Sequence, residues 1–291
     1  MLNISIRYGI IIVLIIPCNN DEIHKELTMN IFTALKNDLG YTNVTNQYIE
    51  LSHRIITERF EAMTSDIHEI KVVAREYGLN LTEIPDTISQ RFSGNYIINI
   101  HSSFMLFLER FAALNGSPMK HAPLIASEED ELSWILNWVY KNGMPEKVRH
   151  LYFICDYYRL ARNVIIHGEI TDSSSALRLA FSKIANRDKT WIKQYIGKLD
   201  APNEVPSISF DDQVLFSKAV YELSQRIYQD ADYDLSLHVN KDIENVKKMI
   251  KPYINNKKRV GKMIENYLLT NYPVFQDKYK ARISDLVDEL I

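Results

Sequence analysis

Three polar residues past the middle of the chain have side chains suited to phosphodiester chemistry. Arg162, Asn163 and His167 occur in the run RNVIIHG, which follows a strongly helical segment. Histidine can accept or donate a proton near neutral pH, because its unperturbed pKa is about 6.5. Arginine stays charged and grips phosphate oxygens with a planar fork of donors. Cleavage of RNA by its own 2′-hydroxyl needs these two functions and no metal, since an arginine can stabilise the charged phosphorane.

The spacing decides which of these side chains can meet. Arg162 and His167 are five residues apart, which on an unbroken helix separates their directions by roughly 140°. Asn163 and His167 are four apart and would be neighbours, so Asn163 could hold the imidazole in one orientation and tautomer. If the helix ends near His167 and Gly168 takes a left-handed C-cap, the histidine can turn back towards Arg162.

The helix that carries these residues has an apolar face whose pattern continues through Arg162. Pro145 suits the start of this helix. An arginine at a core position is costly without partners, so we expect Arg162 to face a lined cleft or an interface. The apolar residues that recur at steps of three and four are Val148, Leu151, Tyr152, Cys155 and Tyr158, followed by positions 162 and 165.

The run RNVIIH resembles the Arg-polar-x-x-x-His signature of the HEPN superfamily, whose members are all-helical bundles. Many of them are metal-independent ribonucleases in toxin–antitoxin, defence and RNA-processing systems. The resemblance covers the six-residue motif and a helical context over residues 95–200. It implies that Arg162 and His167 are the catalytic pair and Asn163 their polar companion. It also implies a homodimer with a composite cleft, an RNA substrate, no metal or organic cofactor, and an antitoxin or another defence protein as a candidate partner.

One position departs from that pattern and keeps two functions open. Some ribonuclease branches of the superfamily have a tyrosine two residues after the histidine, where this chain has Glu169. An acid there would repel phosphate. The first hypothesis is a metal-independent endoribonuclease with a role in microbial defence or as a toxin. The second is a non-catalytic helical binding or scaffold module, either antitoxin-like or nucleotide-sensing.

Further residues are candidates for supporting roles. Glu109, an acid in an apolar helix, could neighbour Arg162, although an exposed acid beside Arg110 is the simpler interpretation. Tyr158 and Arg159 precede Arg162 on its helix. Basic side chains among aromatic ones can follow an RNA backbone, but they more often form a solvated helix face. The candidate RNA-binding residues are Lys257, Lys258, Arg259 and Lys262, with Arg187 and Lys189 nearer the motif.

The composition is that of a folded helical protein. Of 291 residues, 46% are hydrophobic and 24% charged, and glycine and proline number only 9 each. So few helix breakers favour an all-α multi-helix bundle over a many-stranded sheet. The formal charge of −3 excludes a broad positive field for nucleic acid, so RNA contacts would need a local patch. The sequence contains no P-loop, H-E-x-x-H or G-x-S-x-G motif.

The N-terminal segment and the cysteines bear on localisation. Tyr8–Cys18 is an apolar run shorter than the about 20 residues of a membrane-spanning helix. It resembles the apolar part of a secretory signal, but a buried strand or a translation start at Met29 would also fit. Cys18 and Cys155 have no metal or redox spacing. We expect a cytoplasmic protein without a membrane span; export, with Cys18 as a lipoprotein-like N-terminus, is the minority alternative.

Periodicity and capping residues predict helices over most of the remaining chain. Besides the motif helix they cover 47–77, 95–114, 128–141, 174–199, 211–230, 238–250, 256–270 and 278–290. Alternating residues allow strands only near 4–16 and 205–210. Prolines at 202 and 206 mark the best domain boundary. We therefore predict an apolar leader at 1–28, a HEPN-like helical domain at 29–200, and a C-terminal helical region at 207–291.

Overall fold

The computed structural model describes residues 31–62, 67–80, 88–115, 131–167, 173–185, 200–205, 207–232, 239–240, 242–271 and 280–290. These residues form an all-α structure, as the composition predicts, and none of them is in a strand. The strand allowed near 205–210 is wrong, because 207–209 are irregular and a helix begins at Phe210. The leader at 1–28, including the run at 4–16, lies outside the described residues.

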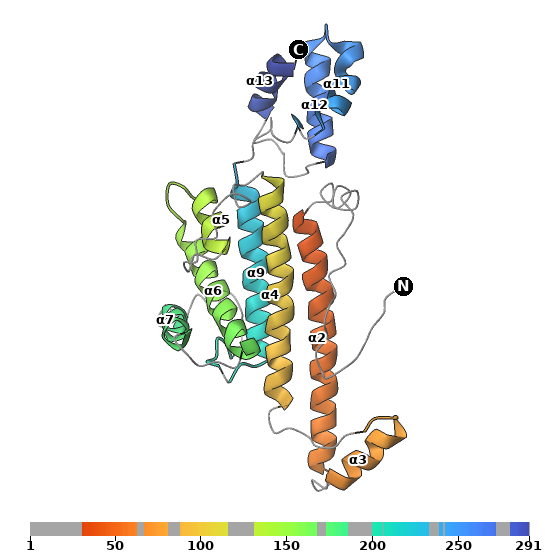
Figure 1. The fold of residues 1–291 in the computed structure, drawn as a ribbon, viewed down its shortest axis with the longest axis vertical. Coiled ribbons are helices and arrows are strands. Elements are labelled where there is room, and N and C mark those ends of the chain that lie inside the picture. The colour runs from red at the N-terminus through yellow and green to blue at the C-terminus, as the bar shows by residue number, and fades with distance from the viewer. Residues whose placement is uncertain are drawn as a thin grey trace.

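Long helices form the body of the molecule (Figure 1). They are α2 (Ile31–Ala62), α4 (Ile88–Leu114), α6 (Glu146–His167) and α9 (Phe210–Asp230). α4 and α9 pack along each other in the centre, with α2 against one side of this pair and α6 against the other. α4 and α9 run in the same direction, and α2 and α6 run in the opposite one.

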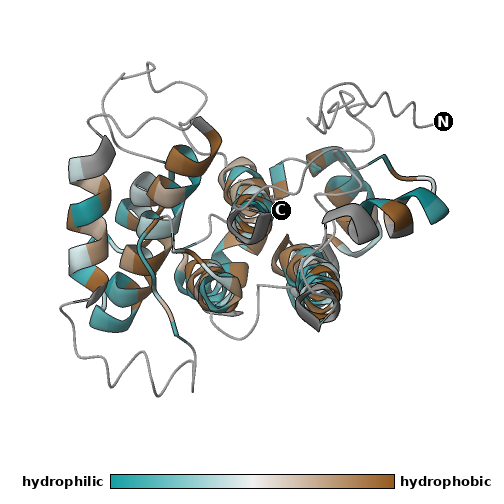
Figure 2. Ribbon diagram, turned by 90° about the horizontal axis from the view of Figure 1, so that it is seen from below, coloured by the Kyte–Doolittle hydropathy of each residue, from teal (hydrophilic) through white to brown (hydrophobic). Residues whose placement is uncertain are grey.

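Ring contacts near the helix ends agree with these directions. Phe32 at the start of α2 stacks on Tyr228 at the end of α9, whereas Tyr96 early in α4 meets Phe210 at the start of α9. Figure 2, which views the bundle along its helices, shows that they carry both hydrophobic and hydrophilic residues.

Shorter helices surround the bundle. α3 (Ile67–Glu76) follows α2, α5 (Glu131–Val139) packs against α4 and α9, and α7 (Ser173–Ala185) packs against α6. α11 (Ile243–Ile250), the 3-10 helix η2 (Lys251–Tyr253), α12 (Lys257–Asn271) and α13 (Lys280–Leu290) pack together beyond the end of α9 (Figure 1). α9, which follows the boundary predicted at 200–207, packs against α2, α4 and α6 of the bundle.

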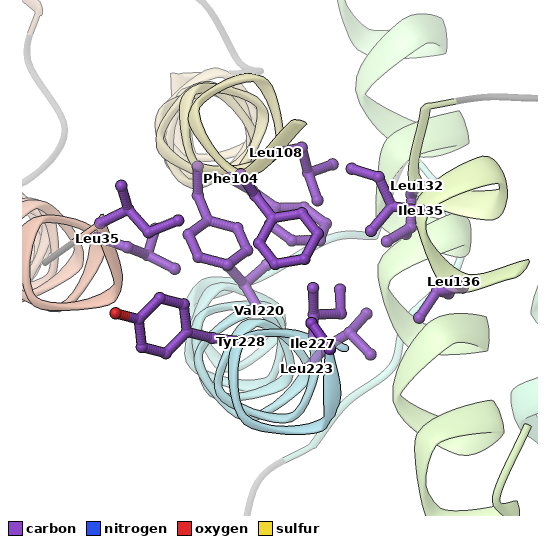
Figure 3. Close-up of a cluster of buried hydrophobic side chains, with 14 of the residues drawn as sticks. Leu35, Phe104, Leu108, Leu132, Ile135, Leu136, Val220, Leu223, Ile227 and Tyr228 are labelled. Carbon is purple, nitrogen blue, oxygen red and sulfur yellow. The ribbon is translucent and has the colours of Figure 1, made fainter. Parts of the chain in front are cut away.

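The core lies where α2, α4, α5 and α9 meet (Figure 3). Leu35, Phe104, Ile135 and Leu223 point into it from these four helices, and each is at most 3% exposed. Within α4, the stretch Arg91–Leu114 is long and apolar enough to cross a membrane by length and composition. Its position among α2, α6 and α9 accounts for that composition, because a helix packed on several sides needs apolar residues around most of its circumference.

Several predicted helix ends agree with the structure. Gly78, with φ of +73°, follows α3; Pro145 directly precedes α6; and α4 ends at Leu114. The single helix predicted at 47–77 is wrong, because α2 begins at Ile31 and ends at Ala62, and α3 is a separate helix.

Candidate functional site

The last turns of α6 carry the three motif residues. His167 is the final residue of α6, so the helix ends where the spacing argument places its end. The apolar face predicted for this helix is buried at Val148, Leu151, Cys155 and Tyr158. Beyond Tyr158 the fully buried position is Ala161, and Arg162 beside it is only partly buried. The structure describes the backbone of His167, and its side chain lies outside the described part.

Arg162 makes one described hydrogen bond. Its Nη1 donates to Oδ1 of Asn163 at 3.0 Å. Its Nε is buried and has no partner among the described residues, and no acid in that part of the chain forms an ion pair with it. A buried donor without a partner costs about 1–3 kcal/mol. Within the described part of the chain, the guanidinium therefore combines a fixed orientation, an uncompensated charge and a donor that an anion's oxygen could satisfy.

A cavity of about 180 Å³ lies beside Asn163, between α4, α5 and α6. Three of its lining residues, Cys155, Arg159 and Asn163, follow each other at steps of four residues, and so share one face of α6. His167 is the next residue in that row. Arg162 is not among the described residues that line the cavity. The remaining lining residues are His101, Phe104, Met105, Leu108, Glu131 and Leu132.

His101 is a residue that the sequence analysis did not select. It comes from α4 and lines the same cavity as Arg159 and Asn163. Its spacing contained a usable signal, because Phe104, Met105 and Leu108 lie three, four and seven residues after it and share its face of α4. That face meets α6, so His101 brings an imidazole from another helix to the cavity that Arg159 and Asn163 line.

The candidate neighbours of Arg162 on its own helix have different environments. Arg159 lines the cavity, but its Nη2 donates to Oδ1 of Asp156 at 2.7 Å, which partly compensates its charge. Tyr158 lies in the core rather than at the site. Its hydroxyl donates to Oδ1 of Asp212 at 2.7 Å, and burial is the main cause that raises its pKa well above the ordinary value.

Asp212 explains how the end of α6 is held against α9. This fully buried carboxylate accepts from the backbone and side-chain nitrogens of Asn203 and from the backbone nitrogen and hydroxyl of Ser209, at 2.7–3.1 Å. Ser209 is the N-cap of α9, with Asp212 at N3 of a capping box. Tyr158 and Asp212 therefore position α6; neither lies in the cavity lining.

The structure does not bring Glu109 next to Arg162. A close contact between Gly94 and Ile165 fixes the level at which α4 meets the end of α6. Glu109 is exposed and lies fifteen residues further along α4, a distance of about 22 Å. Because α4 and α6 are antiparallel, Glu109 lies beside an earlier part of α6 than Arg162.

The basic residues of α12 are also far from the motif. All four are exposed, but Lys257 donates to Asp288 at 2.7 Å, and the guanidinium of Arg259 lies 3.7 Å from the ring centre of Tyr253. α12 lies beyond the end of the bundle opposite to the end of α6 (Figure 1). Lys258 and Lys262 are on this same distant helix. Arg187, Lys189 and Glu169 lie outside the described residues.

Across the described ranges, no group of three or more histidine, cysteine, aspartate or glutamate residues could hold a metal ion. No family model matches the sequence, and no curated protein or solved structure matches it. We therefore infer the function from this chain's own residues.

Proposed function

We propose that this protein is a cytoplasmic, HEPN-type ribonuclease that cleaves RNA without a metal ion at the end of α6, in a defence or toxin role. Arg162 and His167 are its catalytic residues, and Asn163 positions them. The observation that supports this most is the 3.0 Å hydrogen bond from Arg162 to Asn163, which orients a guanidinium whose Nε is buried and unpaired within the described part of the chain.

The proposed reaction needs one cation and two proton transfers. The ribose 2′-oxygen attacks phosphorus, the P–O5′ bond breaks, and the products are a 2′,3′-cyclic phosphate and a 5′-hydroxyl. One proton leaves the 2′-oxygen and another joins the departing 5′-oxygen. Arg162 binds the equatorial phosphate oxygens, where negative charge accumulates. His167 carries out one proton transfer, and Asn163, four residues earlier, holds its ring.

His101 gives the proposal a second proton-transfer group. It lines the cavity that Asn163 also lines, and it comes from α4 rather than α6. Two imidazoles, one acting as base and one as acid, can serve both ends of the reaction at neutral pH. Arg159 extends the same row of α6 and adds a partly compensated positive charge beside the RNA.

The size of this cavity argues against the binding of a whole nucleotide within it. Its volume is about 180 Å³, whereas pockets that enclose small ligands measure roughly 300–1,000 Å³. A whole nucleotide would not fit inside. The non-catalytic alternative, a scaffold that binds a partner and cleaves nothing, is an outcome of the experiment below.

The experiment measures RNA cleavage in excess EDTA. The purified protein is incubated with total RNA beside the double variant Arg162→Ala/His167→Ala. The matched control is Arg149→Ala/His150→Ala, which removes the same two residue types from the first turns of α6. We expect cleavage with cyclic-phosphate ends by the wild type and the control, and none by the motif variant. Equal RNA survival with all three proteins would support the scaffold and end the ribonuclease proposal.

A further inference from the structure

The outward face of α2 exposes a continuous row of large apolar side chains, here called the α2 stripe. Its members occur at steps of three, four, three and four residues, the spacing of the a and d positions of a coiled coil. A seam of this kind normally packs against another helix. The stripe consists of Tyr41 (78% exposed), Val44 (66%), Tyr48 (73%), Leu51 (56%) and Ile55 (43%).

The stripe lies opposite the face that holds α2 in the bundle. The core-facing residues of α2 include Leu35, Leu39 and Asn46, which are at most 3% exposed. At 100° per residue, these residues and the stripe point in directions that differ by roughly 160–200°. α4 and α9 pack on the inner side of α2, and therefore neither helix can cover the stripe.

The inner face of α2 is polar at the same level. Asn43 donates to Ser217 at 2.9 Å and accepts from Gln213 at 2.8 Å. Asn46 is fully buried, and neither its amide nitrogen nor its amide oxygen has a partner among the described residues. This part of α2 thus buries amides and exposes apolar side chains, the reverse of an outer helix in a monomeric protein. The reversal indicates that the outer face also has a packing partner.

We propose that this partner is α2 of a second copy of the chain, and that the two helices pair in antiparallel orientation along the stripe. Covering the five side chains would remove roughly 600 Å² of surface from each protomer, since a buried aromatic side chain alone accounts for about 150–250 Å². Two copies give roughly 1,200 Å², which reaches the range of specific interfaces. A patch that pairs with itself closes a two-fold dimer and leaves no copy of it exposed.

The side chains favour the antiparallel orientation over the parallel one. A parallel pair would stack Tyr41 on Tyr41 and Tyr48 on Tyr48 at a positions, where parallel dimers prefer β-branched residues. The antiparallel pair places Tyr48 of one protomer against Leu51 of the other, Val44 against Ile55, and Tyr41 against Glu58. Each layer then combines residues of different size. The helix dipoles also oppose each other in this orientation.

This dimer is independent of the proposed RNA cleavage. α4 and α9 lie between α2 and α6 (Figure 1), so pairing through α2 keeps the two α6 ends apart. Each protomer would then cleave with its own Arg162 and His167. This arrangement differs from the composite cleft that the resemblance implies.

Sedimentation equilibrium on the full chain tests the dimer. We expect the wild type to have twice the chain mass of 33.9 kDa. Leu51→Glu should sediment as a monomer, with dimer affinity lowered roughly 100-fold or more by an unpaired charge in the seam. The matched control is Leu179→Glu on α7, because Leu179 is 58% exposed and Leu51 is 56% exposed. This control should leave the dimer intact. Leu51→Glu should also keep its EDTA-resistant cleavage.

Disulfide cross-linking tests the orientation in a Cys18→Ser background. An equal mixture of the Val44→Cys and Ile55→Cys proteins should form a cross-linked dimer, and neither protein should do so alone. The proposal is overturned by a monomeric wild type, by a dimer that persists in Leu51→Glu, or by cross-links within the single variants. A wild type that is monomeric, and that becomes dimeric only after residues 1–28 are removed, would also overturn the proposal. In that case the leader would be the segment that covers the stripe.

Discussion

Gly94 of α4 lies directly against Ile165 of α6, three residues beyond Arg162. A Cβ atom added to Gly94 would lie 2.9 Å from Cγ2 of Ile165, closer than side chains pack. The absence of a side chain at position 94 therefore allows α4 to approach the last turns of α6. This contact fixes the position of α4 along α6, and so the part of the Asn163 face of α6 that His101 lies against.

Gly94→Ala should destabilise the protein despite the better helix propensity of alanine. The propensity gain is about 1 kcal/mol, but the added methyl must displace a β-branched side chain in a packed contact, which costs about 1–3 kcal/mol. Gly40→Ala is the control, because Gly40 is in α2 with no atom within 4 Å of the added Cβ. Urea unfolding should show a loss of stability for Gly94→Ala and a gain of about 0.5–1 kcal/mol for Gly40→Ala. Equal gains in both variants would show that the helices are not in close contact at Gly94.

Tyr158→Phe should change how stability depends on alkaline pH. The folded-state pKa of Tyr158 is raised above the ordinary value of 10.0, mainly by burial. The contribution of Tyr158 to the free energy of unfolding is therefore complete below pH 10. It is lost as the pH rises through the folded-state pKa, because only the unfolded chain then ionises. The wild type should lose about 1.4 kcal/mol per pH unit above 10 from this residue. Tyr158→Phe does not show this loss of stability at alkaline pH. At neutral pH the variant is less stable than the wild type by about 2 kcal/mol, the contribution of the hydrogen bond to Asp212.

Urea unfolding of both proteins between pH 7 and pH 11, followed by circular dichroism, checks this expectation. The difference between wild type and Tyr158→Phe should narrow above pH 10. Tyr77→Phe is the control for the substitution itself, because Tyr77 is 79% exposed. A constant difference for Tyr158→Phe would contradict the burial of this hydroxyl.

His101→Gln should lower the rate of RNA cleavage in EDTA by about 100-fold, the lower end of what one proton-transfer group contributes. Glutamine keeps a polar side chain of similar reach but does not exchange protons near neutrality. His53→Gln is the control, because His53 lies on α2 against Phe92 and outside the cavity. The midpoint of thermal unfolding must be unchanged for the comparison to hold. A normal rate in His101→Gln would show that this histidine only packs against its neighbours.

The elements predicted best from the sequence are those whose limits depend on local chemistry. Pro145 starts α6 and Gly78 follows α3 because proline and glycine restrict or relax the backbone at their own positions. The helix predicted at 47–77 failed for a different reason. Periodicity indicates that a helix has an apolar face, and α2 has such a face on its outside. The pattern therefore did not show which face of α2 is the inner one. It also did not show where α2 begins or ends.

The candidate site was only partly predictable for the same reason. Asn163 was selected because it belongs to a short motif, and it does contact Arg162. The spacing within α4 places His101 on an apolar face, but it does not place His101 beside Asn163, which is 62 residues away and meets that face only when α4 and α6 pack. Tyr158 looked like a neighbour of Arg162, and the partner that gives it a structural role, Asp212, lies on α9. Pairings between helices are set by tertiary packing, which a linear pattern does not encode.

Cys155 gives the protein a native chemical reporter beside the cavity. Its thiol lines that space and is 1% exposed, so an alkylating reagent can reach it only when α4 and α6 separate. In a Cys18→Ser background, the alkylation rate would thus measure how often α4 and α6 separate in solution. RNA that holds the two helices together would slow that rate, so occupancy of the site could be followed without any turnover.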